Sequence, residues 1–314
     1  MIEQEARLRN MAWIPKGTFQ MGSHSFYPEE RPVRQETVDG FWIDVHPVTN
    51  DEFFRFVDET GYVTIAERAL NAEDYPGAQP EALVPGSMVF QPTKGPVNLK
   101  DWRNWWAYIP GAQWRHPEGQ TSTIEGRGSH PVVHVAYADV EAYAAWAGKA
   151  LPSEIEWEFA ARGGLDGKVF AWGNDMEPNG QPMANSWQGE FPWQNLLKDG
   201  FARTSPVGSF PPNGYGLFDM TGNVWEWTTD WYRSADELGE HEPCCSGISA
   251  RATADDSYDS AQPTIRIPRK VLKGGSHLCA PNYCLRFRPA ARSPQMIDTG
   301  MTHIGFRCIV RPNQ

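Results

Sequence analysis

Glycine and proline interrupt this chain along its whole length, with 29 glycines and 26 prolines among 314 residues. Glycine favours turns, and proline ends helices and central strands, so no regular element has room to become long. Fourteen tryptophans supply large side chains that can pin such loops to a core. No repeat of roughly 20 to 50 residues is visible, and no linker divides the chain. We therefore predict one loop-rich domain over residues 1–314, with its core at about 11–310.

The charge balance excludes two classes of partner. Lys and Arg total 28 against 39 Asp and Glu, a formal net charge of −11, which favours neither nucleic-acid phosphates nor anionic lipid. The first ten residues lack the apolar core of a signal peptide, and no later run is long enough to span a bilayer. Five cysteines, an odd number, argue against a secreted disulfide framework. We expect a monomeric, cytoplasmic protein, with Cys244 and Cys245 in a surface loop over residues 233–263.

Several short elements can be placed from local signals. Residues 11–23 have the pattern of a β-hairpin with its turn at Pro15 to Gly17, and residues 38–45 have that of a strand. Apolar spacing predicts a helix over residues 138–148.

Two further helices have capping signals. One is expected to begin at Thr49 or Asn50 and to end at Gly61, and the other follows Ser153, which opens a capping box with Glu156.

Two segments, residues 101–106 and 114–119, are rich in tryptophan. Such rings could cradle a peptide, and the alternative is that they fill a core that is short of aliphatic side chains.

Two thiols near the C-terminus are the strongest chemical signal in the chain. Cys279 and Cys284 flank Pro281 and follow the Gly274-Gly275 pair. Glycine lets two backbone segments approach closely, and proline disfavours a helix through the spacer, so a compact loop should bring the sulfurs together. Such a pair suits a disulfide or a soft metal ion. A zinc site completed by His277 and His303 is a further alternative, although the spacing matches no familiar finger.

A second candidate site lies in the glycine-rich stretch between residues 184 and 227. Asp219 and Glu226 are seven residues apart around Gly222 and Asn223. Loops of this kind leave carbonyl oxygens unpaired, and calcium binds carbonyl, Asn and carboxylate oxygens together. The spacing is not that of an EF-hand, so ordinary turn carboxylates remain the alternative.

Taken together, these residues resemble the formylglycine-generating enzymes, also called sulfatase-modifying factors. The Asn-Ser-Trp-Gln-Gly-Glu-Phe-Pro stretch at 185–192 and the cysteine pair are the more diagnostic matches. The matching segments, in chain order, are residues 14–22, 114–119, 146–149, 151–154, 171–174, 184–192, 222–227, 274–276, Cys279 with Cys284, and 305–307.

The resemblance implies an α+β fold, a C-type-lectin-like variant with little regular structure. It also implies an oxidase that converts a cysteine in a Cys-x-Pro-x-Arg segment of an unfolded sulfatase to Cα-formylglycine, with O₂ as acceptor and a thiol reductant. Cys279 and Cys284 would bind Cu(I), which soft thiolates select, with the substrate thiol as third ligand. By the same resemblance Ser276, Trp225 and Tyr283 would line the active site.

The resemblance further implies two structural calcium ions. The ligands of the first ion map onto Asn185, the Ser186 carbonyl, Asp199 and the Phe201 carbonyl. Those of the second map onto Asp219, the Gly222 and Val224 carbonyls, and Glu226.

The chain departs from the family pattern at several positions. His303 stands where many members have asparagine, and His277 stands where an aromatic residue is common, so two imidazoles are expected near the thiols. We include His303 among the catalytic candidates, because an imidazole there could bind metal, move protons or alter substrate choice. Three of the four structural half-cystine positions of secreted members are Ala144, Ala161 and Pro289, which leaves Cys308 unpartnered.

Two other functions stay open. One is a copper or non-haem iron oxidase of this fold acting on another thiol, and the other is a non-catalytic peptide-binding paralogue. The iron enzymes take their histidine ligands largely from an additional N-terminal helical domain, for which no space remains before about residue 11.

Overall fold

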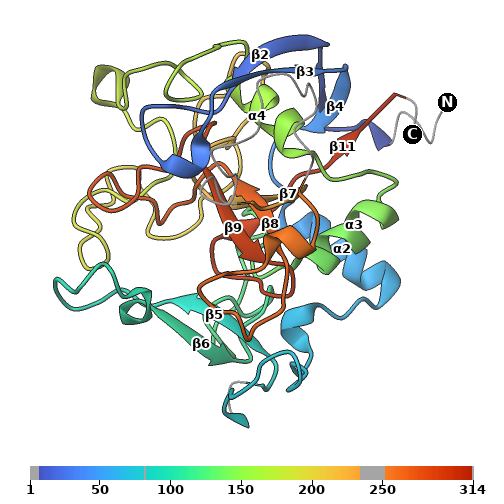
Figure 1. The fold of residues 1–314 in the computed structure, drawn as a ribbon, viewed down its shortest axis with the longest axis vertical. Coiled ribbons are helices and arrows are strands. Elements are labelled where there is room, and N and C mark those ends of the chain that lie inside the picture. Colours follow the sequence, from blue (N-terminus) through green and yellow to red (C-terminus); the bar gives the residue numbers. More distant parts are fainter. Residues whose placement is uncertain (1–6, 81–82, 234–251, 313–314) are drawn as a thin grey trace.

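The computed structural model describes residues 7–80, 83–233 and 252–312. Short strands and helices joined by long loops make up the fold, which confirms the expected α+β architecture with little regular structure (Figure 1). No helix in these three segments is long and apolar enough to cross a membrane. Most of the expected surface loop, with Cys244 and Cys245, lies outside the described residues. The helices are α2 (Asn50–Thr60), α3 (Tyr137–Trp146) and α4 (Glu154–Arg162).

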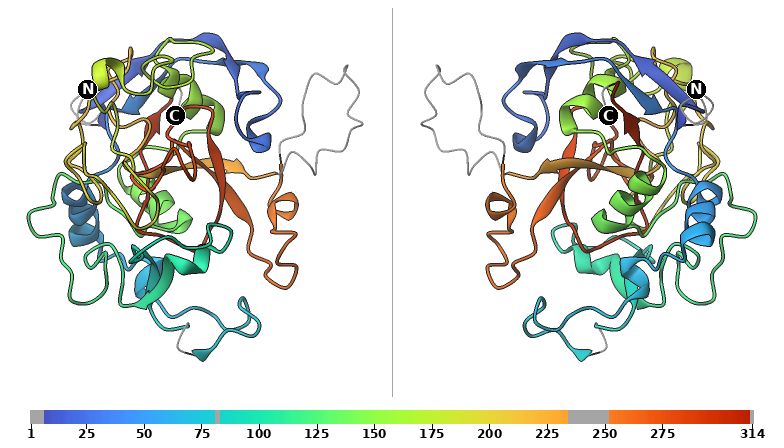
Figure 2. Two further views of the ribbon diagram at one scale, coloured as in Figure 1. Left: turned by 90° about the vertical axis from the view of Figure 1, so that its left-hand side faces the viewer. Right: turned by 90° about the vertical axis from the view of Figure 1, so that its right-hand side faces the viewer.

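In the described part of the chain the strands form four small sheets. The central sheet has the order β10-β7-β8-β9, and the others are β1-β4-β11, β2-β3 and β5-β6. Figures 1 and 2 show β2 and β3 at one end of the molecule and β5 and β6 at the other, with the central sheet between them. The bounds are β1 (Met11–Ile14), β2 (Gly17–Met21), β3 (Arg34–Val38), β4 (Phe41–Asp44), β5 (Gly86–Phe90), β6 (Trp106–Pro110), β7 (Trp225–Trp231), β8 (Arg269–Lys273), β9 (Arg292–Met296), β10 (Ile304–Gly305) and β11 (Ile309–Val310).

The hairpin predicted over residues 11–23 is wrong. β1 pairs with β4 and β2 pairs with β3, so the two strands lie in different sheets. Distant partners decide the pairing: Trp13 lies opposite Trp42, with ring centroids 5.4 Å apart, and the hydroxyls of Thr18 and Thr37 are 3.0 Å apart. Cross-strand side-chain pairs of this kind stabilise a sheet. The strand predicted over residues 38–45 is in part the loop that joins β3 to β4.

The three predicted helices are confirmed, because their signals are local. Thr49 caps α2 in a capping box with Glu52, and the helix ends at Gly61 in the left-handed conformation. Ser153 caps α4 in the same way. Each cap satisfies backbone N–H groups that the first helical turn leaves without partners. Helix α3 begins one residue before the predicted range and ends two residues before its end.

Aromatic side chains fill much of the core. Phe53 of α2 stacks on Tyr143 of α3, with centroids 5.9 Å apart, and packs edge-on against Trp114. Trp114 and Trp105 are almost completely buried, whereas Trp102 is 55% exposed. For most of these rings the core-filling interpretation is therefore correct. Trp105 also contacts the candidate site described below.

Glu154, the first residue of α4, lies in a buried ion network. Its carboxylate accepts hydrogen bonds from Arg292 Nε at 2.8 Å and from Lys273 Nζ at 3.4 Å. Burial alone would raise the pKa of Glu154, but the charges of Arg292 and Lys273 outweigh it and lower the pKa to about 2. A carboxyl with a lower pKa in the folded state than in the unfolded state stabilises the fold above its unfolded pKa.

This network predicts an acid-sensitive fold. Because the unfolded pKa is about 4.3 and the folded one about 2, the stabilisation should be lost as pH falls through this window, by about 2 to 3 kcal/mol in all. Urea unfolding at pH 6 and pH 3 measures it. Glu154→Gln should be less stable than wild type at pH 6 and should lose less stability on acidification. Equal losses in both proteins would contradict the assignment.

Candidate active site

The loop after β8 carries the two thiols. Its two glycines are required because neighbouring backbone atoms lie too close for a Cβ atom. Gly275 has a φ of +72°, and a Cβ there would lie 2.5 Å from the Arg286 carbonyl oxygen. At Gly274, with φ +91°, a Cβ would lie 2.8 Å from the Met220 carbonyl oxygen. L side chains rarely adopt such φ values. The Gly-Gly pair therefore lets this loop pack directly against two other backbone segments, as predicted.

Within the loop, two tight turns place Cys279 beside Cys284. The Cys279 N–H donates to the Ser276 carbonyl at 2.9 Å, and the Cys284 N–H donates to the Ala280 carbonyl at 2.7 Å. Pro281 is tolerated at the start of the second turn because an N–H there would have no partner in the turn. Both thiols are free, and they lie within hydrogen-bonding reach of each other. The expected compact loop is confirmed.

The electrostatics of the pair are unequal. Burial opposes ionisation of Cys279, but hydrogen bonds from the Cys284 thiol and the Ser276 N–H outweigh it and lower the pKa of Cys279. The Ser276 nitrogen is 3.4 Å from Cys279 Sγ. The hydrogen bond to Cys279, together with burial, raises the pKa of Cys284 well above its ordinary value. Of the two thiols, Cys279 is therefore the one that ionises first, and its sulfur accepts a hydrogen bond from the Cys284 thiol.

The structure brings three of the other predicted site residues together. Ser276 Oγ lies 3.4 Å from His303 Nδ1, and the Trp225 N–H donates to the His303 carbonyl at 2.8 Å. β10 and β7 are parallel neighbours with Ile304 opposite Trp225, which fixes His303 at this edge of the central sheet. Burial and the nearby imidazoles of His277 and His134 lower the pKa of His303, so its ring is neutral.

Tyr283 lies on an aromatic wall built from distant segments. Its ring stacks on Phe191 with centroids 4.7 Å apart and meets Trp105 edge-on at 5.4 Å. Trp106 meets the His303 ring at 4.8 Å. Tyr283 is 38% exposed, whereas Phe191 and Trp105 are buried behind it, so a peptide can reach the Tyr283 ring. The tryptophan segment at 101–106 thus borders the site as well as the core.

The four residues of the zinc alternative do not form a site. Within the described segments, no three His, Cys, Asp or Glu side chains gather closely enough to hold one metal ion. His277 instead uses Nδ1 and its backbone N–H to contact the Asn223 carbonyl, at 2.8 and 3.0 Å.

In the first candidate calcium site, two of the predicted ligand oxygens lie close together and share a donor. The Ser186 carbonyl and Asp199 Oδ2 both accept from Gln188 Nε2, at 2.5 and 2.6 Å. Asp199 Oδ1 accepts from the Phe201 N–H at 3.0 Å. Two oxygens that share one donor face the same point, and neutral oxygens with one carboxylate are a ligand set that suits calcium. The Asn185 amide group donates to the Arg203 carbonyl at 2.9 Å.

The second candidate calcium site has two unlike halves. Asp219 is buried, and burial raises its pKa. Its Oδ2 accepts from the Gly208 N–H at 2.8 Å, whereas its Oδ1 has only a 3.4 Å contact with Asn223 Nδ2, so Oδ1 is the oxygen that a cation could bind. Glu226 is already neutralised: Arg307 Nε and Nη2 donate to its two oxygens at 2.7 and 2.8 Å. A cation at this position would have to share Glu226 with Arg307.

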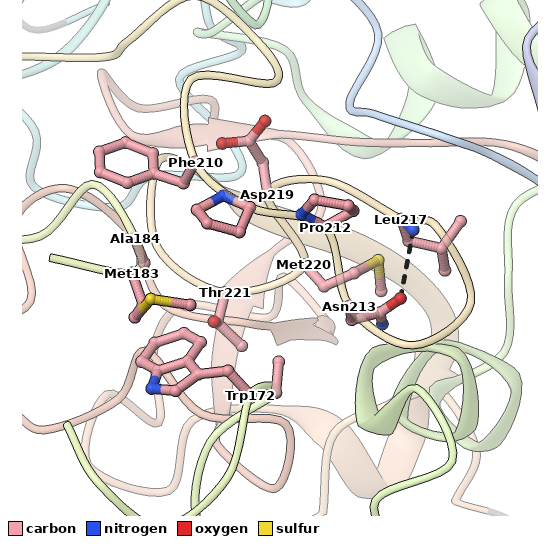
Figure 3. Close-up of a pocket in the computed structure, with 12 residues that line it drawn as sticks. Trp172, Met183, Ala184, Phe210, Pro212, Asn213, Leu217, Asp219, Met220 and Thr221 are labelled. Atoms are coloured by element: carbon pink, nitrogen blue, oxygen red, sulfur yellow. Dashed lines mark hydrogen bonds between the residues drawn. The ribbon is translucent and has the colours of Figure 1, made fainter. Parts of the chain in front are cut away.

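A small cavity of about 20 Å³ borders Asp219, enough for about one water-sized particle (Figure 3). The Asp219 carboxylate points away from Trp172 and Thr221 on the opposite wall.

Asn223 joins both candidate calcium loops to the thiol loop. Its Oδ1 accepts from Asn185 Nδ2 at 3.4 Å, and its Nδ2 lies near Asp219. Its backbone carbonyl oxygen is contacted by the Nδ1 atom and the backbone N–H of His277, a residue that lies two positions before Cys279. One fully buried residue thus ties the three loops together, through its side chain to the candidate calcium loops and through its backbone carbonyl to the thiol loop.

Comparison with known proteins agrees with the resemblance seen in the sequence. Residues 1–312 match the family profile described as "Sulfatase-modifying factor enzyme 1-like domain". The chain is 53% identical over 305 residues to a formylglycine-generating enzyme of Mycobacterium tuberculosis. The alignment covers 97% of this chain and 99% of that protein. This chain belongs to the formylglycine-generating enzyme family. A second member, from Thermomonospora curvata, is 44% identical, covering 97% of this chain and 94% of that protein.

A solved structure has the same fold. PvdO from Pseudomonas aeruginosa superposes with a TM-score of 0.60 at 25% identity, over 96% of this chain and 94% of that chain. The expected formylglycine-generating-enzyme fold is confirmed. In this member of the family Cys308 is a buried, free thiol.

Sequence reasoning missed several residues of the site, because their partners are far away in the chain. Phe191 belongs to the segment that the family resemblance had singled out, but nothing local indicated that it would stack on Tyr283. The Leu285 N–H donates to the hydroxyl of Tyr27 at 2.9 Å. Arg286 lies 4.0 Å from the Tyr27 ring centroid and pairs with Glu29 at 2.5 Å. The N-terminal segment thus closes one end of the thiol loop.

Proposed function

We propose that this protein converts a cysteine of an unfolded sulfatase to Cα-formylglycine. The single observation that carries the proposal is the Cys279–Cys284 pair, with Cys279 buried and Cys284 partly exposed, placed beside the exposed ring of Tyr283. Membership of the formylglycine-generating enzyme family supports it. In the net reaction the substrate thiol and two reductant thiols react with O₂ to give the aldehyde, hydrogen sulfide, water and one disulfide, which balances atoms and electrons.

Cys279 and Cys284 are the residues that would hold the Cu(I) ion. The residues fit this ion, because soft thiolates select it and the surroundings of Cys279 lower its pKa, which makes the thiolate easier to form. When bound, copper would supply the redox chemistry that O₂ activation requires.

The other site residues position the substrate and control protons. The Leu278 N–H donates to Ser276 Oγ at 3.3 Å, which leaves the serine hydroxyl proton free to point at the neutral His303 Nδ1. Tyr283 and Trp106 offer ring faces and edges to the peptide on either side of its cysteine. The buried setting of Cys279 keeps bulk water away from the reacting sulfur.

Calcium is proposed as a structural ion in both loops. Asn185, Ser186, Asp199 and Phe201 would hold the first. Asp219, Gly222, Val224 and Glu226 would hold the second, with Arg307 sharing Glu226. Through Asn223 both ions would stiffen the loop that precedes Cys279.

Mass spectrometry of a peptide with the sequence Cys-Thr-Pro-Ser-Arg tests the function. After aerobic incubation with the Cu(I)-loaded protein and a thiol reductant, the cysteine should become an aldehyde. Omission of oxygen, or addition of a Cu(I) chelator, should stop the conversion. A peptide that survives although copper is bound would overturn the proposed substrate, and conversion without copper or oxygen would overturn the proposed chemistry.

His303 should orient Ser276 rather than carry the reaction. In His303→Asn the amide oxygen can still accept from the serine hydroxyl, so we expect turnover to fall by less than about tenfold. In His303→Leu this partner is lost, and the fall should approach one hundredfold, the lower range for a group that assists proton transfer. Steady-state kinetics of both variants measures the difference. Equal rates in the two variants would show that the Nδ1 contact is unimportant.

A further inference from the structure

A larger cavity, of about 290 Å³, borders the thiol loop at Pro281 and Asn282. These two residues are in the middle of the spacer between Cys279 and Cys284. None of the residues assigned above to the copper site or to the positioning of Ser276 lines it. The volume is close to the lower limit of ligand pockets, about 300 Å³, so it suits a large side chain better than a cofactor.

The lining of this cavity is part apolar and part polar, and two of its aromatic side chains are held in place by packing. Trp172 and Phe287 both line it, and Phe170 stacks against each of them, with centroids 5.0 and 5.8 Å apart. Met176 and Met183 complete the apolar lining. Methionine adapts its shape to different apolar partners, so two fixed rings and two flexible side chains can accept more than one kind of side chain.

Two exposed leucines follow each other beside the cavity, and the first of them, Leu196, contacts residues of its lining. Leu196 and Leu197 are 52% and 44% exposed. The Leu196 N–H donates to the carbonyl of Gln188 at 2.6 Å, and its Cγ lies 3.1 Å from where a Cβ on Gly189 would be. Gln188 and Gly189 both line the cavity. Single exposed leucines are ordinary, whereas a contiguous apolar patch beside a cavity indicates a binding surface.

The charged residues of the lining indicate the sign of the ligand. The charged residues that line the cavity are two glutamates, Glu177 and Glu190, and one lysine, Lys198, so the lining has a net negative charge. The Glu190 carboxylate accepts from Asn282 Nδ2 at 2.9 Å, which connects the acidic rim directly to the thiol loop. A ligand with an apolar group and a nearby positive charge complements this surface.

We propose that this cavity, with its Leu196–Leu197 rim, is a second subsite for the substrate polypeptide. It takes an apolar side chain and a neighbouring Lys or Arg from outside the segment that contains the modified cysteine. This inference rests on the proposed function, since an unfolded chain that is held at its cysteine necessarily passes over the surface around the thiol loop. The shared residues Pro281 and Asn282 make the subsite continuous with the reaction site.

Two peptides of different length test the subsite. One spans only the Cys-x-Pro-x-Arg segment. The other is the sulfatase sequence extended by roughly ten residues on each side, which reaches about 35 Å when extended. Both carry serine in place of the target cysteine and a fluorescent label, and their Kd values are measured by anisotropy. The variants are Leu196→Ser for the rim and Glu177→Lys for the charge. Leu165→Ser, a 37% exposed leucine that does not line the cavity, is the matched control.

We expect the long peptide to bind wild type more tightly than the short one. Leu196→Ser and Glu177→Lys should each weaken the long peptide roughly three- to tenfold, the scale of one lost apolar or charge contact. The short peptide and the Leu165→Ser control should be unchanged. With cysteine peptides, KM for the long substrate should rise while kcat is constant, because this binding is equal in ground and transition states.

The outcomes separate the two proposals. Equal affinities of long and short peptides for wild type, or equal effects of all three variants, would overturn the subsite. Binding of the long peptide that depends on Leu196 and Glu177, without any conversion of cysteine, would overturn the proposed function and leave the subsite standing.

Discussion

Replacing Cys279 with serine should abolish formylglycine formation and Cu(I) binding together. Cys279 is 2% exposed, and its environment favours the thiolate. A serine hydroxyl is neither soft nor ionised at neutral pH, so it cannot replace this ligand. We expect turnover to fall by roughly a thousandfold or more, as for groups that act directly on reacting atoms. Competition with a chromophoric Cu(I) chelator measures binding independently of turnover.

Substitutions of Cys284 and Cys308 supply the comparisons. Cys284→Ser removes the second ligand and the hydrogen bond that lowers the pKa of Cys279, so it should also lose copper. Cys308→Ala is the matched control, because Cys308 is a buried free thiol that the site does not use. It should bind one copper ion and turn over like wild type. Copper retained by the Cys279→Ser variant would show that the metal site is elsewhere, and a non-catalytic paralogue would be insensitive to all three changes.

The structure shows which parts of this protein were predictable. The beginnings of α2 and α4 follow from residues within one turn of Thr49 and Ser153, and their ends follow from Gly61 and Gly163, so the sequence was sufficient to place them. The same holds for the turn that brings Cys279 to Cys284. In each case the interaction is closed by hydrogen bonds between residues five or fewer positions apart.

What the sequence did not disclose depends on contacts between distant segments. The segment at 11–23 has the local signals of a hairpin, yet β1 pairs with β4, and Trp13 lies opposite Trp42. Cross-strand aromatic pairs of this kind stabilise a sheet, and a short turn does not provide that contact. The wall behind Tyr283 combines Trp105 with Phe191, which are 86 residues apart in the numbering. Spacing in a single sequence carries no information about such pairs.

The ion pair of Glu226 is the clearest example. Arg307 was recognised only as part of a family motif, whereas the structure shows both side chains fully buried and joined by two hydrogen bonds. Trp157 Nε1 adds a third bond to Glu226 at 2.7 Å. The interpretation of Glu226 as a calcium ligand therefore has a competitor that spacing could not reveal.

Glu226→Gln should destabilise the protein by about 3 to 5 kcal/mol in calcium-free buffer, the usual cost of breaking a buried ion pair by removing one partner. The buried guanidinium of Arg307 would keep only neutral partners, among them the carbonyls of Phe218 and Asp219 at 2.9 and 3.2 Å. Denaturant unfolding monitored by tryptophan fluorescence gives this loss. A loss under about 1 kcal/mol would contradict the ion-pair assignment.

The same measurement with calcium separates the two roles of Glu226. A ligand at one hundred times its Kd stabilises the folded state by about 2.7 kcal/mol. If Glu226 also holds calcium, wild type gains this amount and Glu226→Gln does not, so the difference between them grows when calcium is added. Asp219→Asn is the matched control, because it removes a candidate ligand and leaves the pair with Arg307 intact. It should lose the calcium-dependent gain alone. If calcium stabilises Glu226→Gln as much as wild type, then Glu226 acts only through Arg307, and any ion in this loop depends on Asp219 and the carbonyls.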